Sequence, residues 1–187
     1  MKKLSIVLIL LVALFMSCAN SPNRTVESTA LDHLNSGKDL YAEGKNDEAI
    51  VEFDRAIAID IGLREAYLFR GAAYGNIGDF DHAIADFSEA IRLDPNDASA
   101  YHSRGIAYSV KDEWDRAIEN FSESIRLKPD YPVDYHNRGI AYSTIGEWDR
   151  AIADFEAALG IDPNQDNTRQ KLEEALQERD ERTGSLR

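Results

Sequence analysis

The chain has 187 residues, of which 43% are hydrophobic and 29% are charged, and its formal net charge is −13. Such acidity argues against nucleic acids and anionic lipid head groups as partners, because both are bound through basic patches. It mildly favours basic partners, although acidic residues on the outer faces of helices would account for it by themselves. The length from residue 30 onward is enough for one continuous hydrophobic core.

Residues 1–17 have the pattern of an export signal. Lys2 and Lys3 form a short basic region, and an apolar run of 13 residues follows from Leu4 to Met16. This run is too short to span a bilayer comfortably and has the length of the apolar part of a secretory signal peptide. We therefore expect residues 1–17 to be removed from the mature protein.

Cys18, the only cysteine of the chain, directly follows this apolar run. The arrangement resembles the lipobox of bacterial lipoproteins, although Phe15 stands where that motif usually has leucine. The resemblance implies that Cys18 is acylated and anchors an exported lipoprotein in the bacterial cell envelope, facing the periplasm. The alternative is ordinary signal-peptide cleavage after the small residues Ser17 and Ala19. Residues 18–29 would then form the lipidated cysteine and a polar, flexible tether.

From residue 30 onward the chain repeats a unit with a period of 34 residues. The copies that begin at Tyr101 and Tyr135 agree at 16 of 30 aligned positions. A fixed period of this size indicates a stacked repeat architecture. We predict four copies, of which the first is the most divergent, at residues 30–63, 64–97, 98–131 and 132–165.

Each unit has the pattern of two helices joined by a turn. Tyr101, Gly105 and Tyr108 fall at i, i+4 and i+7, which is one face of a first helix. Glycine suits a left-handed residue at the end of that helix. Aspartate at the start of the second helix can cap free N–H groups and favours the helix dipole, and proline prevents the second helix from continuing. These positions hold Gly44, Gly78 and Gly146, then Asp47, Asp81, Asp115 and Asp149, then Pro95, Pro129 and Pro163.

Small residues recur inside both helices of the unit. A glycine inside a helix costs about 1 kcal/mol relative to alanine, so a recurrent one needs a structural reason. We predict close contact between the two helices, for example between Gly105 and Ala117, with tyrosine and phenylalanine rings around it. One such pair cannot bury its apolar side alone, so neighbouring pairs must stack.

The repeated residues resemble the signature of the tetratricopeptide repeat (TPR) family. In the second copy this signature is Tyr67, Gly71, Tyr74, Ala83, Phe87, Ala90 and Pro95. The resemblance implies an all-α solenoid of helix-turn-helix units in a right-handed superhelix, with the first helices lining a concave face. Residues 166–187 carry Leu172 and Leu176 at packing positions among charged residues, which predicts a capping helix and a tail.

Carried over by repeat position, the resemblance places a partner-binding groove on the first helices. We expect its centre at His102, Ile106, His136 and Ile140. The isoleucines either offer an apolar strip to a peptide or pack against the first helix of the next repeat, and both alternatives stay open. The predicted lining is Tyr41, Leu68, Ala72, Asn76, His102, Ile106, Ser109, His136, Ile140 and Ser143.

His102 and His136 occupy equivalent positions in the repeat and could approach each other. None of the predicted lining residues carries a carboxylate or thiolate, so we expect no metal and no other cofactor. Some TPR domains clamp a partner's C-terminal carboxylate with basic and amide side chains. Lys38 is the only basic residue at those groove positions, which argues against such a clamp.

The spacing of Ser, His, Asp and Cys residues gives no catalytic constellation, and the glycines do not form a phosphate-binding loop. Arg70, Arg104 and Arg138 recur at the repeat period, and pairing with Asp86 and Asp154 explains them better than anion binding. The sequence therefore predicts a non-enzymatic scaffold that holds a protein or peptide partner in its groove. The alternative is a carrier or sensor of a small apolar ligand. The partner, the membrane leaflet and the oligomeric state stay open.

Overall fold

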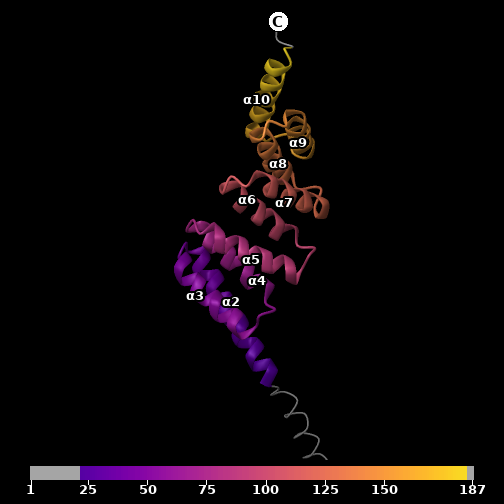
Figure 1. Ribbon diagram of the computed structural model, residues 1–187. Coiled ribbons are helices and arrows are strands. Elements are labelled where there is room, and N and C mark those ends of the chain that lie inside the picture. The colour runs from indigo at the N-terminus through magenta and orange to yellow at the C-terminus, as the bar shows by residue number, and fades with distance from the viewer. Residues whose placement is uncertain (1–21, 185–187) are drawn as a thin grey trace, which may run out of the picture.

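The computed structural model describes residues 22–184, and all regular structure in this range is helical. Nine helices in the described residues form four sequential antiparallel pairs and one final helix (Figure 1). The all-α fold predicted from the repeats is therefore confirmed. The pairs are α2 (Pro22–Ala42) with α3 (Asn46–Ile59), α4 (Arg64–Asn76) with α5 (Phe80–Leu93), α6 (Ala98–Val110) with α7 (Trp114–Leu127), and α8 (Pro132–Thr144) with α9 (Trp148–Ile161), followed by α10 (Asp166–Thr183).

The helix pairs stack into an elongated body, with α2 and α3 near one end and α10 at the other (Figure 1). The first helices of consecutive pairs contact each other, from α2 to α4, α6, α8 and finally α10. Among the described helices, the second helices α3, α5, α7 and α9 make no such contact with one another. The stack is therefore tighter along its first helices, which line the inner side as predicted.

The turn inside each pair requires one residue in the left-handed region. Gly44, Gly78 and Gly146 have φ angles of 78°, 83° and 81°. The third pair has Asp112 at the equivalent position, with φ 58°. Aspartate tolerates this region better than most residues with a side chain. The prediction that a left-handed residue ends each first helix is confirmed, and it extends to the one repeat that lacks the glycine.

The N-terminal segment differs from the expected tether. Helix α2 begins at Pro22, so residues 22–29 continue the first helix of the first pair. Proline is compatible with the first position of a helix, because the N–H that it lacks would have no partner there. No further proline or glycine follows before Gly37, so nothing in the chain stops the helix earlier. Residues 1–17, with the predicted export signal, and Cys18 lie outside the described residues.

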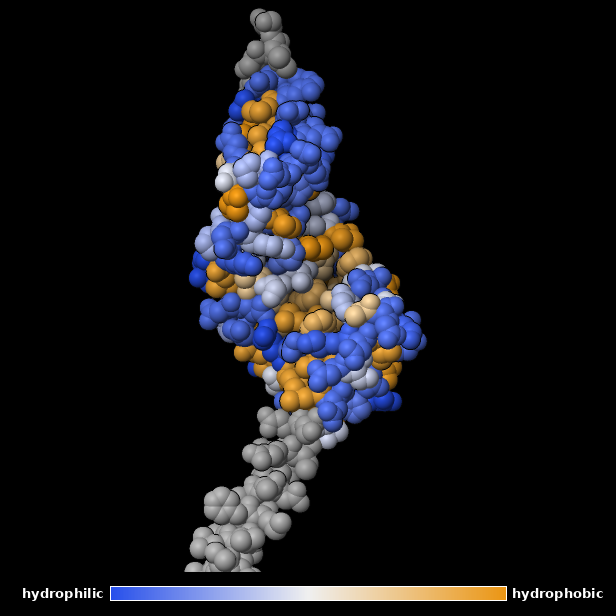
Figure 2. All heavy atoms as spheres, turned by 180° about the vertical axis from the view of Figure 1, so that it is seen from behind, coloured by the Kyte–Doolittle hydropathy of each residue, from blue (hydrophilic) through white to orange (hydrophobic). Residues whose placement is uncertain are grey.

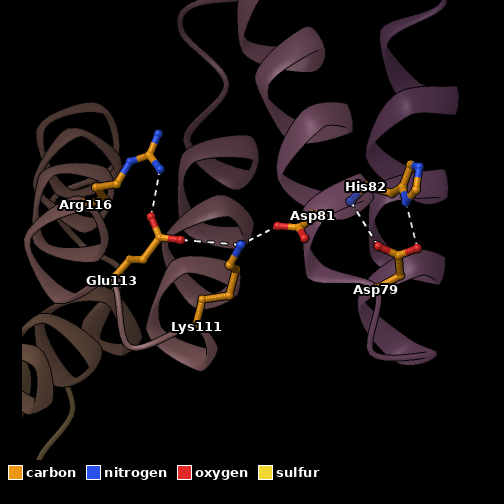
Figure 3. A network of polar contacts seen from close by, with 6 residues as sticks. All are labelled: Asp79, Asp81, His82, Lys111, Glu113 and Arg116. Carbon is orange, nitrogen blue, oxygen red and sulfur yellow. Dashed lines mark hydrogen bonds and ion pairs between the residues drawn. The ribbon is translucent and has the colours of Figure 1, made fainter.

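The aspartates expected to cap the second helices have a different role. Asp47, Asp81, Asp115 and Asp149 lie within the first helical turn, where a negative charge favours the dipole, rather than at the cap. Asp79 caps α5, accepting a hydrogen bond from the His82 backbone N–H (Figure 3). The capping prediction was wrong because each second helix begins one residue before the aspartate.

One of these aspartates instead links two pairs. Asp81 on α5 forms an ion pair with Lys111 at the end of α6 (Figure 3). Lys111 also lies 3.5 Å from Glu113, which pairs with Arg116 at 2.7 Å. This network runs along the edge of the stack where the turns lie, and it ties the second repeat to the third.

The core contact inside each pair is between a glycine and a phenylalanine ring. A Cβ atom added at Gly37, Gly71, Gly105 or Gly139 would lie 2.5 to 2.9 Å from the ring 16 residues later. At Gly105 the nearest atoms to such a Cβ belong to the ring of Phe121, one of the rings predicted to surround the contact between the two helices. Ala117, the predicted partner of Gly105, is fully buried on α7. The rings that fill this space are Phe53, Phe87, Phe121 and Phe155.

Helix α10 covers the last pair. Leu172, Ala175 and Leu176 pack against a cluster that includes Ile152 and Phe155 of α9. Its other faces carry charged and amide side chains that form pairs within the helix, such as Lys171 with Glu174. These contacts fit the predicted capping helix. No helix within residues 22–184 combines the length and apolar character needed to cross a membrane.

Candidate binding groove

Three hollows lie along the first helices. The largest, of about 720 Å³, is bounded by α2, α4, α6 and the loops that precede α6 and α8, and we name it the wide hollow. The Trp114 hollow, of about 230 Å³, lies between α6 and α8. The Trp148 hollow, of about 460 Å³, lies between α8 and α10. On the face drawn in Figure 2, apolar side chains gather in a depression near the middle of the stack, bordered by polar ones.

Eight of the ten predicted groove residues line these hollows. The wide hollow contains four of them, and the two tryptophan hollows contain the others, with Ile140 shared between both. Asn76 instead donates a hydrogen bond to Asn46 Oδ1 at 3.1 Å, near the turns of the first two pairs. The residues placed in the hollows are Tyr41, Leu68, Ala72, His102, Ile106, Ser109, Ile140 and Ser143.

The wide hollow combines apolar side chains with charges that are already paired. Lys38, the one basic residue expected near the groove, donates to Glu65 Oε1 at 2.8 Å and lies 5.0 Å from the Phe69 ring centre. Arg64 forms an ion pair with Asp97. Lys38 is therefore engaged with Glu65 on the neighbouring first helix.

The two tryptophan hollows are equivalent sites one repeat apart. Each is lined by an isoleucine, a serine and a tryptophan that differ by 34 in residue number, as in Trp114 and Trp148. The two hollows differ in the side chains contributed by the next first helix, which is α8 for the Trp114 hollow and α10 for the Trp148 hollow. The Trp114 hollow has Asn137 and Ile140, whereas the Trp148 hollow has Lys171 and Glu174 in the same repeat positions. Equivalent positions of two successive repeats therefore form an apolar hollow at Trp114 and a charged hollow at Trp148.

The two isoleucines at the predicted centre behave differently. Ile106 is 40% exposed and faces the Trp114 hollow. Ile140 is half-buried and packs against the cluster formed by α9 and α10. The two alternatives left open by the sequence therefore apply to one residue each. Ile106 is an accessible apolar contact, and Ile140 is mainly part of the packing between repeats.

The two histidines join neighbouring repeats rather than each other. His102 Nδ1 hydrogen-bonds to Asp134 Oδ1 at 2.5 Å, and Ser124 Oγ donates to the other oxygen of Asp134 at 2.5 Å. His136 Nδ1 lies 2.8 Å from Thr168 Oγ1. Each histidine thus bonds to the residue 32 positions later, on the next first helix. Asp134 and Thr168 are almost completely buried, so these bonds lie inside the interfaces between repeats.

His136 was predicted to line the groove, but its bond to Thr168 makes it part of the interface between repeats. Burial lowers the pKa of His136, and the nearby charge of Lys171 lowers it further. Its position therefore favours the neutral ring. Within residues 22–184, no group of three or more His, Cys, Asp or Glu side chains is placed to hold a metal ion.

The arginine row bridges the second helices of successive repeats. Arg138 donates two hydrogen bonds to Asp154, at 2.8 and 2.7 Å, and a third to Ser122 at 2.9 Å. These partners lie 16 residues after and 16 residues before the arginine. Burial tends to lower the pKa of Arg138, but the hydrogen bonds and charge of Asp154 outweigh it and raise the pKa. The expectation that this row is structural is confirmed for Arg138.

The other arginines of the row follow the same pattern with one change. Arg70 pairs with Asp86 and Asp54. Arg104 has the neutral Asn120 as its main partner, at 2.8 Å, and burial lowers its pKa. The first repeat has Ser36 at the position of the arginine row, and Glu52 bonds to His33 and Arg55 instead.

The geometry of residues 22–184 defines a helical repeat protein with hollows along its first helices. Two family models for the tetratricopeptide repeat match the chain, one over residues 71–109 and the other over residues 104–177. Together they span more than half of the sequence. The chain belongs to the tetratricopeptide repeat family, whose members are non-catalytic scaffolds.

Several solved structures share this fold. A crystal structure of MamA is 27% identical, with a TM-score of 0.79 over 84% of this chain and 86% of that one. YrrB, described as a TPR protein with an unusual peptide-binding site, is 18% identical, with a TM-score of 0.74 over 84% of this chain and 81% of that one. The first TPR of Spaghetti (RPAP3), bound to the HSP90 peptide SRMEEVD, is 23% identical, with a TM-score of 0.60 over 61% of this chain and 90% of that one. No match was found among curated protein sequences.

Proposed function

We propose that this protein is a scaffold that holds a protein or peptide partner along its first helices. The observation that carries the proposal is the run of three hollows along the inner face, which contain accessible apolar side chains such as Ile106. A row of shallow hollows suits an extended or helical peptide, because successive side chains can occupy successive hollows. Two structural relatives are described with a peptide or a peptide-binding site, which supports this use of the groove.

A small apolar ligand fits the groove less well. Pockets for such ligands usually enclose about 300–1,000 Å³ and cover most of the ligand. The Trp114 hollow is the most apolar of the three, but its volume is about 230 Å³, close to that of one large side chain. The wide hollow is larger but is bordered by the ion pairs of Arg64 and Lys38. We therefore favour a peptide over a small ligand.

The second part of the proposal is the location. We infer that the protein is a lipoprotein of the bacterial cell envelope, anchored at Cys18 and facing the periplasm. The apolar run from Leu4 to Met16 and the single cysteine directly after it support this inference. The anchor would keep the groove near the membrane surface, where it could bind a partner protein of the cell envelope.

To test the groove assignment, the tagged full chain is expressed in the source bacterium and cross-linked in cells. It is then purified in detergent, and the proteins captured with it are identified. Ile106→Ser removes an accessible apolar contact in the groove, so we expect the partners captured by the unaltered protein to be lost. Ile145→Ser is the matched control, since Ile145 is 42% exposed, against 40% for Ile106, and does not line the three hollows. Equal capture by both variants would place the binding surface elsewhere.

A further inference from the structure

The charge difference between the two tryptophan hollows points to the chemistry of the partner. The Trp148 hollow is lined by Lys171, Glu174 and Glu178. Lys171 Nζ lies 2.6 Å from Glu174 Oε2, so these two charges are paired. Glu178 is exposed, and no hydrogen bond or ion pair joins it to any other described residue. The hollow thus offers one unpaired carboxylate beside an indole ring.

The ring of Trp148 already has a cation above it. The guanidinium of Arg182 lies 5.4 Å from the Trp148 ring centre. Cations favour the negative face of an indole, and tryptophan is the best of the aromatic side chains for this contact. Lysine and arginine also have aliphatic stems that can lie along apolar walls such as Ile140. A basic side chain of a partner would therefore match both the wall and the free carboxylate of the Trp148 hollow.

The neighbouring Trp114 hollow selects for a different side chain. Its walls include Val110, Trp114 and Phe121, and its only polar linings are Ser109 and Asn137. It carries no formal charge, so a basic side chain would lose hydration there without gaining a partner. An aliphatic side chain would bury apolar surface instead.

The distance between the hollows suggests how a peptide would reach both. They share Ile140, and adjacent packed helices lie about 8–10 Å apart. In a polyproline II segment, side chains three residues apart point to the same side and are separated by about 9 Å. An extended segment of this type can therefore fill both hollows at once with residues i and i+3.

We propose that the C-terminal half of the groove recognises an extended peptide with an aliphatic residue and a basic residue three positions apart. The aliphatic residue occupies the Trp114 hollow, and the basic residue occupies the Trp148 hollow beside Glu178. The net charge of −13 is complementary to such a partner and would speed its encounter with the groove. This inference rests on the proposed function and adds the chemical class of the partner.

The test is fluorescence anisotropy with the full chain in detergent and labelled hexapeptides. The probes are Pro-Leu-Pro-Pro-Arg-Pro, its reverse order Pro-Arg-Pro-Pro-Leu-Pro, and the same pair with Glu in place of Arg. We expect the better Leu/Arg peptide to bind about tenfold more tightly than its Leu/Glu counterpart, the size of effect that a charge-assisted hydrogen bond gives. Equal affinities of the Arg and Glu peptides would overturn the proposal.

Variants assign the preference to the two hollows. Glu178→Gln should reduce the preference for Arg over Glu to less than about threefold. Glu173→Gln is the control, because Glu173 is exposed on the same helix and does not line the hollow. Val110→Ser should weaken both peptides alike, since Val110 is 54% exposed in the Trp114 hollow. The same loss of preference in both glutamate variants would contradict a local role of Glu178.

The outcomes also separate this inference from the proposed function. If none of the hexapeptides binds while Ile106→Ser still abolishes capture of partners in cells, the peptide chemistry is wrong and the scaffold function stands. If the Leu/Arg peptides bind as expected while Ile106→Ser leaves capture in cells unchanged, the hollows have the inferred selectivity but the cellular partner binds elsewhere.

Discussion

At the scale of single residues, the glycines of the first helices determine how closely the two helices of a pair approach. Each lies beneath a buried phenylalanine ring 16 residues later, with no room for a Cβ atom. Glycine inside a helix normally lowers stability. Here its cost is offset by the packing of the ring, because a larger residue would push the second helix away. The same contact recurs in all four pairs, so it is part of the repeat itself.

Gly105→Ala tests this contact. The new Cβ would lie 2.7 Å from Phe121 Cε1, and overpacking of this kind costs about 1–3 kcal/mol, more than the helix propensity gained. We expect a loss of unfolding free energy of about 1–2 kcal/mol, measured by urea denaturation.

Gly75→Ala is the matched control, because Gly75 lies inside α4 and a Cβ there meets nothing within 4 Å. We expect this variant to be more stable than the unaltered protein by up to about 1 kcal/mol. The two substitutions should thus have opposite signs, and a change of the same sign in both would refute the assigned contact.

At the scale of elements, side chains from the first helices hold successive helix pairs together. The arginine row connects second helices through partners 16 residues away on either side. The histidines connect each first helix to the next through partners 32 residues later. Each of these polar contacts forms only when its partner in the neighbouring repeat lies at the matching position along the helix. They therefore favour one register of the stack over others that would bury a similar apolar area.

The junction between the last pair and α10 should respond to pH through His136. Burial lowers the pKa of this ring, so the unfolded chain takes up the proton first as the pH falls. The associated stability is present above the ordinary histidine pKa of about 6.5 and is lost as the pH falls toward the lower pKa of the folded state. We expect the unaltered protein to lose more in Tm than His136→Asn between about pH 7.5 and 5.5.

The comparison is made by thermal unfolding at both pH values, with each variant referred to its own Tm at the higher pH. This removes the constant cost of losing the bond to Thr168. If His136→Asn loses as much in Tm as the unaltered protein, the ring is not held neutral by its surroundings.

At the scale of the whole molecule, the chain is an elongated stack with an open groove along its inner side. Its C-terminal end is covered by α10, whose outer faces are polar. Solenoids need such terminal helices for solubility, because an uncapped repeat would expose the face that normally packs on a neighbour. At the other end, the proposed anchor at Cys18 precedes the start of α2 by only a few residues. Because α2 begins at Pro22, fewer residues remain for a flexible tether than the sequence predicted.

The anchor is tested by labelling cells with an alkynyl fatty acid and comparing the unaltered protein with Cys18→Ala. Each buried methylene of an acyl chain contributes about 0.8 kcal/mol to membrane binding, so a multiply acylated protein stays bound. We expect label and membrane association for the unaltered protein and neither for Cys18→Ala. Ser21→Ala, which keeps the cysteine, should behave like the unaltered protein. Equal labelling of the two test proteins, or none in either, would disprove the lipoprotein assignment.

The sequence by itself determined the repeat, the helix pairs and the left-handed turns. These features depend on local rules and on apolar residues that recur at a fixed period. One such rule is that glycine favours a left-handed turn position, as at Gly78 with φ 83°. The sequence also predicted most of the residues that line the hollows along the first helices, because equivalent positions in stacked repeats must face the same side. Ile106 is accessible as expected for this reason.

Only the tertiary structure decided which groove residues are free to meet a partner. His136 has the spacing of a groove residue, but its bond to Thr168 makes it part of the repeat interface. Glu178 lies outside the predicted groove because it belongs to the capping helix, yet packing of α10 on α8 brings it to the Trp148 hollow. Such roles depend on side chains some 30 residues apart meeting across a helix interface. No local pattern specifies that meeting, because it exists only once the repeats are stacked.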